Sequence, residues 1–341
     1  MTISSVTESA GTPAATDAPD RWGRLGRSIA GSRITGPGAA LAIAVVIFWA
    51  ITSTFMTASN VSLILQQSVV VGMLALGQTV VIITAGIDLA NGAIAVLGTV
   101  VMGKLAIGSG HPELLVLLVG IGVCVALGGL SGGIITRLNL PPFIVTLGLL
   151  TIVSAAARLY TKSQSFPVTS PLLTWLHWTV SIGSLQLTYG TLLMIGAYLV
   201  VGYLLTQTGW GRHVFAAGNS PEAARLAGIK VKRVLLSVYL LAGLCYGIAA
   251  WEALGRIPVA DPSSYSSANL DSITAVVIGG TSLFGGRGGV FGTLIGTLIV
   301  LVLRNGLTQA NIDSLYQDVA TGALVIVAVA VDQLVRRRQQ R

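Results

Sequence analysis

Few residues in this sequence could carry out chemistry in an enzyme active site. The three histidines, His111, His177 and His213, are far apart in the chain, and their spacing does not match that of a metal site. No set of serine, histidine and aspartate and no pair of carboxylates can be argued from the pattern. We therefore expect no catalytic residue, no metal and no cofactor, and an intramembrane enzyme has little support.

Two acidic side chains stand at the edges of apolar segments. Asp88 directly follows an apolar run, in the stretch Ala-Gly-Ile-Asp-Leu-Ala-Asn-Gly, and a carboxylate at that place marks function or pairing. It is either a gate on a pathway or a cap on the free N–H groups of the next helix. A proton relay is disfavoured because no second buried acid or histidine accompanies it.

Asn269 and Asp271 open a later apolar segment, where they either cap a helix or form a polar mouth.

Neutral polar residues also lie within or beside apolar segments. Gln78, Asn91 and Thr146 carry uncharged hydrogen-bonding groups that would let a polyhydroxylated solute pass, or that would equally well join neighbouring helices. Thr281 and Ser282 precede a glycine-rich stretch, 285–289. No Lys followed by Ser or Thr completes a nucleotide-binding loop there, so we interpret the stretch as flexible backbone at a turn.

The composition identifies the elements that must position these residues. Hydrophobic residues make up 53% of the 341 residues and charged residues only 9%, whereas an average soluble domain has about 25% charged residues. So few charges cannot cover a soluble surface of this size. The composition predicts a polytopic membrane protein and excludes a disordered chain, a disulfide-rich module and an ordinary cytosolic enzyme. Cys124 and Cys245 both lie in apolar runs and are not placed for a disulfide.

Apolar runs predict an all-α protein with about ten transmembrane helices. A crossing needs about 20 apolar residues, so the eighth and ninth runs, with 14 and 16 residues, are either broken helices or a re-entrant hairpin. We expect a disordered cytoplasmic tail over 1–36, a transmembrane domain over 37–335 and a basic tail over 336–341. The predicted spans are 37–56, 61–85, 90–108, 113–136, 142–160, 187–207, 234–254, 270–283, 289–304 and 317–335.

The positive charges predict the orientation of these spans, because Lys and Arg are retained on the cytoplasmic side. With the N-terminus inside and alternating spans, fifteen of the 20 Lys and Arg residues face the cytoplasm. Both termini are then cytoplasmic, the protein lies in the plasma (bacterial inner) membrane, and the net charge of +8 needs no nucleic acid to explain it. Trp175 and Trp178 in the outer loop 161–186 predict a short interfacial helix.

The largest inner loop, 208–233, contains the signals of a short helix. Asn219 or Ser220 suits the N-cap, Pro221 the first helical position, and Gly228 a left-handed C-terminal cap. Two turns are too short to be stable alone. The helix therefore either lies on the bilayer surface or docks into a cytoplasmic subunit.

Several motifs make the chain resemble the permease subunits of bacterial ABC importers. The pattern Glu-Ala-Ala with a glycine four residues later, at 222–228, is similar to the EAA motif of that family. Further stretches narrow the resemblance to the branch that carries ribose, xylose, arabinose and galactose. They are Gly77 to Ile82 running into Gly86 to Leu89, Pro141 to Gly148, Gly279 to Gly286, and Ala328 to Asp332. The resemblance covers residues 60–335.

The resemblance implies a homodimer, or a pair with a similar subunit, with a pathway between the two. It also implies a cytoplasmic ATPase that supplies ATP hydrolysis and an extracytoplasmic solute-binding protein. The residues that it assigns to ATPase coupling are Glu222, Ala223, Ala224, Arg225, Leu226 and Gly228. The pathway or gate candidates are Gln78, Asp88, Asn91, Phe143, Thr146, Asn269, Asp271, Thr281 and Ser282.

Departures from the family pattern leave the substrate open. This chain has Ala85 where family members usually have Gly, and Ala90-Asn91 where they usually have Ser-Val. It has Leu149-Leu150 where Thr-Met is commoner. A related permease for branched-chain amino acids or a signalling molecule is therefore an alternative to a sugar permease. A secondary transporter is a further alternative, but it usually needs charged ion-coupling groups inside the spans, and these are scarce here.

Overall fold

The computed structural model describes residues 35–108 and 110–339, and nearly all of its regular structure is helical. Most of the predicted N-terminal tail (1–36) and the end of the predicted basic tail (336–341) lie outside the described residues. The elements, in chain order, are α2 (Thr35–Ile51), α3 (Ala58–Ile83), α4 (Asn91–Gly108), α5 (Glu113–Leu138), α6 (Pro142–Thr161), β1 (Phe166–Pro167), α7 (Pro171–Thr174), the 3₁₀ helix η1 (Trp175–His177), β2 (Thr179–Ile182), β3 (Leu185–Thr188), α8 (Tyr189–Gln207), α9 (Gly209–Asn219), α10 (Pro221–Leu226), α11 (Val231–Arg256), β4 (Val259–Ala260), α12 (Ala268–Ile278), α13 (Val290–Gln309) and α14 (Ser314–Gln339).

Each of the ten predicted spans contains a helix. In the described part of the chain, six helices are long and apolar enough to cross a membrane: α3, α5, α6, α8, α11 and α13. The apolar stretches of α2, α4, α12 and α14 are shorter. The prediction of an all-α membrane protein is confirmed, while ten full crossings and the side of each terminus stay predictions.

The eighth and ninth predicted spans differ from the structure in length. Helix α12 has 11 residues and ends at Ile278, where the sequence predicted a span to 283, so at about 1.5 Å per residue it is too short to cross a bilayer. Helix α13 has 20 residues and continues to Gln309, beyond the predicted end at 304. The polar residues after 303 end the apolar run but not the helix, because Arg304 and Asn305 find partners in Asp271 and Asn60.

The centre of the bundle is α3, whose residues from Ser68 to Ile83 are all buried. Glycines let other helices approach closely, as small residues do in membranes. A Cβ on Gly128 of α5 would lie 3.0 Å from the Cα of Gly243 in α11, and one on Gly132 would lie 2.8 Å from the Cβ of Tyr239. Gly128, Gly132 and Gly243 therefore serve packing between α5 and α11.

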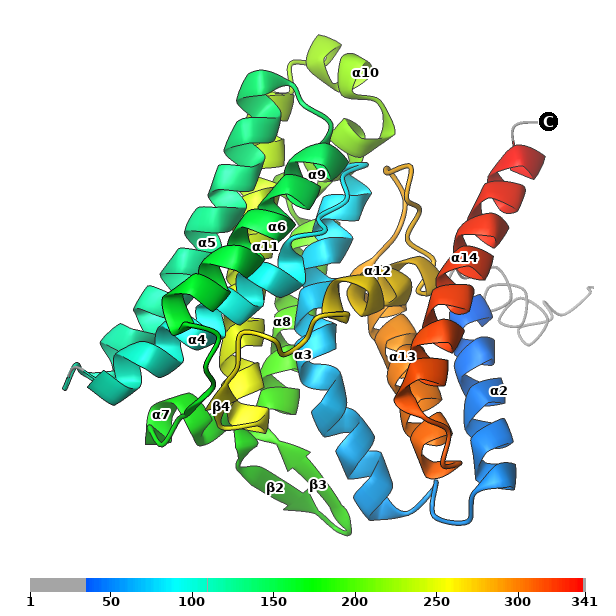
Figure 1. Cartoon of the computed structure of the whole chain (residues 1–341). Helices are drawn as coiled ribbons and strands as arrows, with labels where there is room; N and C mark the ends of the chain where they lie inside the picture. The colour runs from blue at the N-terminus through cyan, green and yellow to red at the C-terminus, as the bar shows by residue number, and fades with distance from the viewer. Residues whose placement is uncertain (1–34, 109, 340–341) are drawn as a thin grey trace, which may run out of the picture.

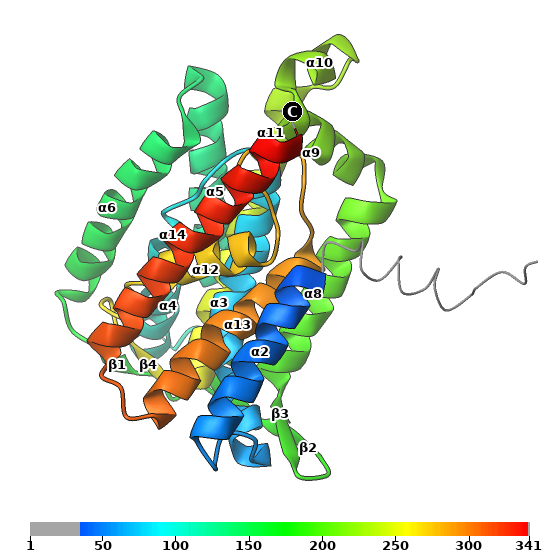
Figure 2. The ribbon, with the colours of Figure 1, turned by 90° about the vertical axis from the view of Figure 1, so that its right-hand side faces the viewer.

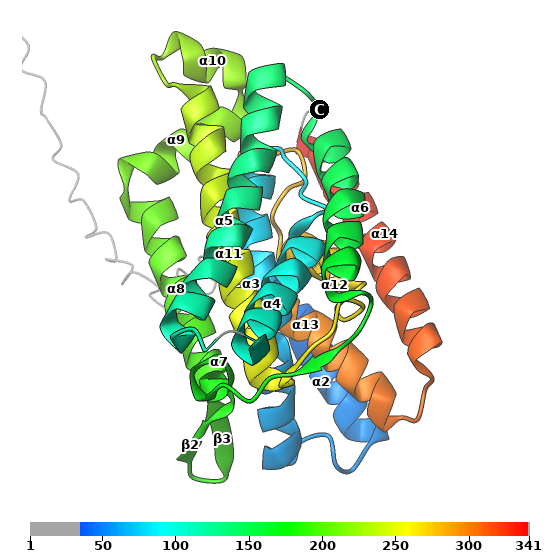
Figure 3. The ribbon, with the colours of Figure 1, turned by 60° about the vertical axis from the view of Figure 1, so that its left-hand side comes forward.

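The molecule has two distinct ends (Figure 1). Helix α10 and the end of α14 lie at one end, which we call the α10 end. The β2–β3 hairpin and α7 lie at the opposite end, the hairpin end. Figure 2 shows α14 running along the outside of the bundle beside α13, and Figure 3 shows α5 and α6 on either side of α4.

The segment 161–188 is more elaborate than the single interfacial helix predicted for it. It forms α7 and η1, in which Trp175 lies 6.4 Å from Trp251 between ring centroids, and then the antiparallel hairpin β2–β3. Gly183 at the turn has a φ of 64°, which favours glycine. The prediction missed the hairpin because each strand has only four residues.

Two helices begin in the interior of the bundle. Helix α4 runs from the middle of the molecule towards the hairpin end, and α12 lies across the middle (Figure 1). Their first turns are joined: the Asn91 side chain donates to Ser272 Oγ at 2.7 Å, and the Asn269 side chain donates to the Leu89 carbonyl at 3.3 Å. Irregular backbone precedes both helices in the interior of the bundle. Inside a membrane, such backbone is tolerated only where protein shields its polar groups from lipid.

Candidate functional site

The predicted helix of the 208–233 loop is present as α10. Ser220 is its N-cap, with Oγ accepting from the Ala223 N–H at 3.3 Å, and Pro221 is its first residue. The Gly228 N–H donates to the Arg225 carbonyl at 2.9 Å, and Gly228 has a φ of 84°. The local signals in the sequence therefore predicted the helix and both of its ends correctly.

The residues assigned to ATPase coupling face two directions. Leu226 is 91% exposed, and Glu222, Ala223, Arg225 and Gly228 are exposed with it. Ala224 is only 4% exposed and packs into the hydrophobic core of this chain. Leu226 therefore presents an apolar side chain to the surroundings at the α10 end. Ala224 instead fixes α10 to its own bundle.

Close to α10, three segments of the chain pack against one another through backbone atoms. The Gly286 N–H donates to the Ile83 carbonyl at 2.8 Å, which joins the 279–289 loop to the end of α3. Gly218, at the end of α9, packs against both: a Cβ added there would collide with the Ile83 carbonyl oxygen and lie 2.9 Å from the Gly286 nitrogen. We call Ile83, Gly218 and Gly286 the glycine junction. The glycine junction places the end of α9, just before α10, in direct contact with the 279–289 loop between α12 and α13.

Several of the pathway candidates gather around the segment 84–90. Asp88 is fully buried and accepts hydrogen bonds from the Ala90 N–H at 2.9 Å and the Tyr246 hydroxyl at 3.1 Å. The Gln78 side-chain amide forms two hydrogen bonds with the backbone of Asp88. Its N–H donates to the Asp88 carbonyl at 3.1 Å, and its oxygen accepts from the Asp88 N–H at 3.2 Å. Thr146 donates to the Ile87 carbonyl at 2.9 Å. Together with the Asn91 and Asn269 contacts, these bonds hold the irregular backbone in place.

Three other candidates lie elsewhere. Phe143 is 49% exposed near the start of α6, away from this polar centre. Thr281 is buried and its hydroxyl accepts from the Gly289 N–H at 3.3 Å, while Ser282 Oγ accepts from the Phe284 N–H at 3.4 Å. Thr281 and Ser282 therefore shape the glycine-rich loop at the α10 end rather than joining the polar centre.

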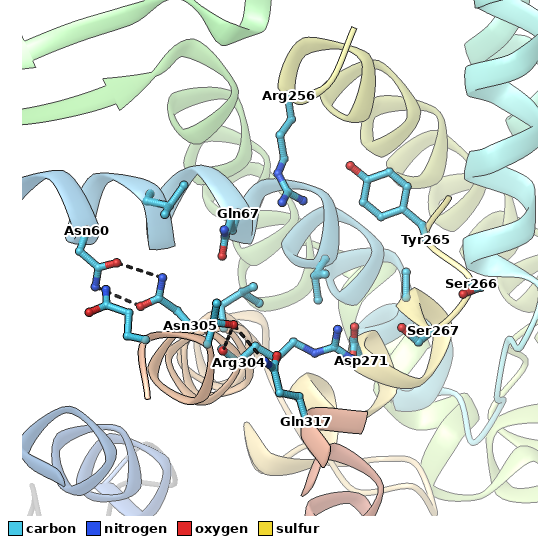
Figure 4. Close-up of a pocket in the computed structure, with 16 residues that line it drawn as sticks. Asn60, Gln67, Arg256, Tyr265, Ser266, Ser267, Asp271, Arg304, Asn305 and Gln317 are labelled. Atoms are coloured by element: carbon cyan, nitrogen blue, oxygen red, sulfur yellow. Dashed lines mark hydrogen bonds and ion pairs between the residues drawn. The ribbon is translucent and has the colours of Figure 1, made fainter. Parts of the chain in front are cut away.

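Asp271 belongs to a cavity of about 460 Å³ in the half of the molecule nearer the hairpin end, which we call the hairpin-side cavity (Figure 4). Its carboxylate accepts from Arg304 at 2.7 Å, and Arg304 also bonds Asp318 at 3.3 Å. Asn60 and Asn305 exchange two hydrogen bonds of 3.0 Å on the same wall. The lining comes from α3, the end of α11, α12, α13 and α14, and is mostly polar without being strongly charged.

The sequence reasoning missed three residues near this cavity. Arg256 and Tyr265 line it, although neither was singled out. Glu252, one helical turn before Arg256, is 1% exposed, and neither of its carboxylate oxygens has a hydrogen-bond partner in the described chain. The statement that no second buried acid accompanies Asp88 is therefore wrong. The signal was available, since Glu252 is an acid inside the seventh predicted span.

The described residues hold no cluster of three or more His, Cys, Asp or Glu side chains that could bind a metal ion. Their polar groups instead bond one another, line a cavity, or lie on an exposed helix. This arrangement suits passage and docking better than catalysis.

Comparison with known proteins decides the family. A family profile described as the permease component of a branched-chain amino acid transport system matches residues 60–329. The chain belongs to this permease family. The resemblance of the sequence motifs to ABC importer permeases is thereby confirmed, and the chain is a multi-pass membrane protein of that kind.

Relatives of this permease are named for the import or transport of sugars. The chain is 43% identical to the fructose import permease protein of Rhizobium meliloti, over 83% of this chain and 80% of the relative. It is 36% identical to the ribose import permease protein of Bacillus subtilis, over 87% of this chain and 92% of the relative. It is 32% identical to the D-allose transport system permease protein of Escherichia coli, over 87% and 90%. No solved structure matches the chain.

Proposed function

We propose that this permease is the membrane-spanning subunit of an ATP-driven importer that carries a monosaccharide into the cell. The observation that supports this most directly is the 43% identity to a fructose import permease over 83% of the chain. Relatives named for ribose, allose and galactose import extend the same substrate class. The subunit works as a homodimer or with a similar permease, together with a cytoplasmic ATPase and an extracytoplasmic solute-binding protein.

In this proposal the α10 end faces the cytoplasm. The ends of helices and the loops at that end carry Arg137, Arg212, Arg225, Lys230, Lys232, Arg233 and Arg287, whereas Lys104, Arg158, Lys162, Arg256 and Arg304 lie towards the hairpin end. The excess of positive charge supports a cytoplasmic α10 end by the positive-inside rule. The binding protein then delivers its solute at the hairpin end, where the hairpin-side cavity lies.

Helix α10 is the proposed contact with the ATPase. Its exposed residues, Leu226 above all, dock into the ATPase, and Ala224 anchors the helix to the bundle. Movement of α10 reaches α12 and α13 through the glycine junction, because backbone packed on backbone leaves no side chain to absorb a displacement. ATP binding drives transport only if the ATPase binds one arrangement of these helices better than the other.

A branched-chain amino acid is the second candidate substrate, because the family profile is described in those terms. Uptake by intact cells separates the two. Cells that lack this chain are complemented with it and given radiolabelled D-fructose, D-ribose, D-allose, D-galactose or L-leucine. The proposal expects uptake of at least one sugar that depends on this chain and on ATP. Uptake of leucine with none of the sugars would show the second candidate to be correct.

The coupling role is tested with a matched pair of exposed leucines at the α10 end. Leu226→Ala removes the side chain proposed to dock, while Leu140→Ala removes a 41% exposed leucine between α5 and α6. We expect Leu226→Ala to lower copurification of the ATPase and sugar uptake at least fivefold, with unchanged amounts of permease in the membrane. Leu140→Ala leaves both unchanged. Normal uptake and ATPase retention in the Leu226 variant would remove α10 from the coupling role.

A further inference from the structure

We propose that the hairpin-side cavity is a binding site that holds one monosaccharide during transport, with Arg256, Gln67 and Tyr265 as the groups that contact it. This inference rests on the proposed function and gives it a site. The cavity of about 460 Å³ falls within the range of about 300–1,000 Å³ that is common for small-molecule pockets. Its lining comes from α3, the end of α11, the segment 265–267, α12, α13 and α14, so a ligand there contacts several elements that only the fold brings together.

One wall of the cavity is formed by polar side chains that mostly bond one another. Asn60 and Asn305 bond each other through both of their amides, and Asn60 also donates to the Phe55 carbonyl at 2.8 Å. Asp271 and Arg304 form an ion pair at 2.7 Å. Because these groups bond one another, they form a fixed polar surface that carries little free charge. Such a wall admits a neutral hydroxylated molecule without attracting ions strongly.

The groups proposed to contact the sugar face this wall. Arg256 reaches into the cavity from the end of α11, and it interacts with Tyr265, which lies beside it (Figure 4). The amide of Gln67 lines the cavity and has no hydrogen-bond partner among the residues that the structure describes. The planar guanidinium of Arg256 and the amide of Gln67 offer several donors and one acceptor. Neighbouring hydroxyl groups on a sugar ring match donors in such a fork.

Tyr265 separates this cavity from a second one. It also lines a space of about 100 Å³ between α4, α6 and the segment 262–266, where Arg158 and Asn269 lie. Tyr265 has a φ of 54°, a left-handed conformation that is rare for a bulky residue, and its hydroxyl is buried beside Arg256. Strained residues gather at functional sites. Its ring offers an apolar face to the C–H groups of a sugar.

The small number of groups that can contact the sugar sets the strength of binding. A carrier must release its solute, so a site with two hydrogen-bonding side chains and one aromatic ring suits weak, transient binding. An amino acid would place its carboxylate on Arg256, but its ammonium group would find the Asp271 carboxylate already bonded to Arg304. The site therefore favours a neutral sugar over a zwitterion.

Protection from thiol labelling tests the site directly. Both native cysteines, Cys124 and Cys245, are buried, so an introduced cysteine can be labelled against a low background. Ser267→Cys places a thiol in the cavity wall, and Ser181→Cys places a matched thiol on the exposed strand β2. The permease in lipid nanodiscs, with neither ATPase nor binding protein, is treated with a small water-soluble thiol reagent in the presence of D-fructose or D-ribose.

We expect saturating sugar to slow labelling at position 267 at least threefold and to leave labelling at position 181 unchanged, while L-leucine protects neither. Arg256→Met and Gln67→Leu, combined with Ser267→Cys, should each raise the sugar concentration needed for half-protection about tenfold. Arg256→Lys should recover part of the loss. Absence of protection by the sugar that the cells import, or equal protection in the Arg256 and Gln67 variants, would overturn the site. Failure of the proposed function is a separate result, since it would show as no sugar uptake by the complete wild-type importer.

Discussion

The ion pair between Asp271 and Arg304 makes an asymmetric prediction about stability. The Asp271 side chain is 6% exposed and its partner on Arg304 lies at 2.7 Å, whereas the Arg304 side chain is 26% exposed and also reaches Asp318 at 3.3 Å. Arg304 therefore keeps a partner when Asp271 is changed. Among the described residues, Asp271 has no second ion-pair partner when Arg304 is changed. The two single variants should not cost the same.

The magnitudes follow from this geometry. Removing one partner of a buried ion pair costs about 3–5 kcal/mol, and the partial exposure of Arg304 places Arg304→Met near the lower limit, at about 3 kcal/mol. Asp271→Asn removes one charge-assisted hydrogen bond and costs about 1.5 kcal/mol. The double variant leaves no unpaired carboxylate on Asp271, so we expect a loss of about 2 kcal/mol instead of the roughly 4.5 kcal/mol sum, as contacting residues are coupled. Asp318→Asn, at a 58% exposed side chain, is the control and should cost less than about 1 kcal/mol.

The assay is the apparent melting temperature of the purified permease in one detergent, measured for all five proteins under identical conditions. Unfolding of a protein of this size is rarely a two-state process, so the order of the values matters more than each value. We expect Arg304→Met to melt lowest, with the double variant above it. Equal losses for the two single variants, or a double variant that melts lowest of all, would refute the asymmetry. Either result would mean that Asp271 has another partner or caps α12 alone.

Further predictions concern residues whose environments differ in one respect. Glu252→Gln should leave the melting temperature unchanged or raise it, because neither carboxylate oxygen of Glu252 has a partner in the part of the chain that the structure describes. Asp88→Asn should lower it, because Asp88 accepts bonds from Ala90 and Tyr246. The reverse order would contradict the contacts described for both residues. Gly218→Ala should destabilise the permease by about 1–3 kcal/mol and uncouple ATP hydrolysis from sugar uptake, since the new methyl group has no space at the glycine junction. Gly148→Ala, in α6 with no atom near the added methyl group, is its control, and parallel behaviour of the two variants would argue against the junction.

Most of the fold followed from apolar periodicity and local signals. The run lengths located a helix in each of the ten predicted spans. Ser220, Pro221 and Gly228 marked the ends of α10 because capping depends on neighbouring residues alone. The ends of α12 and α13 could not be placed in this way. Whether a helix continues past Arg304 depends on Asp271, which lies 33 residues earlier and is brought close only by the fold.

The candidate sites were predicted less completely for the same reason. The acids and amides around 84–90 were singled out one by one, but nothing local indicated that Gln78 bonds the backbone of Asp88 or that Asn91 bonds Ser272. The direction of each side chain on α10 was also not available, so Ala224 was grouped with exposed residues although it packs inward. Cavity residues such as Arg256 lie in loops and at helix ends, where the pattern of apolar and polar residues does not indicate whether a side chain is buried.

The interlocked starts of α4 and α12 have a consequence for how the protein is made. The Asn91 side chain finds its partner on Ser272, 181 residues later in the chain. At a synthesis rate of about 5–20 residues per second, the ribosome needs roughly 10–40 s to supply that partner. Throughout this interval α4 and the segment before it are in the membrane, or at its surface, with polar groups that lipid cannot satisfy. Insertion of the first half of this permease must therefore include a waiting state, held by the insertion machinery or by water, that only the arrival of α12 can end.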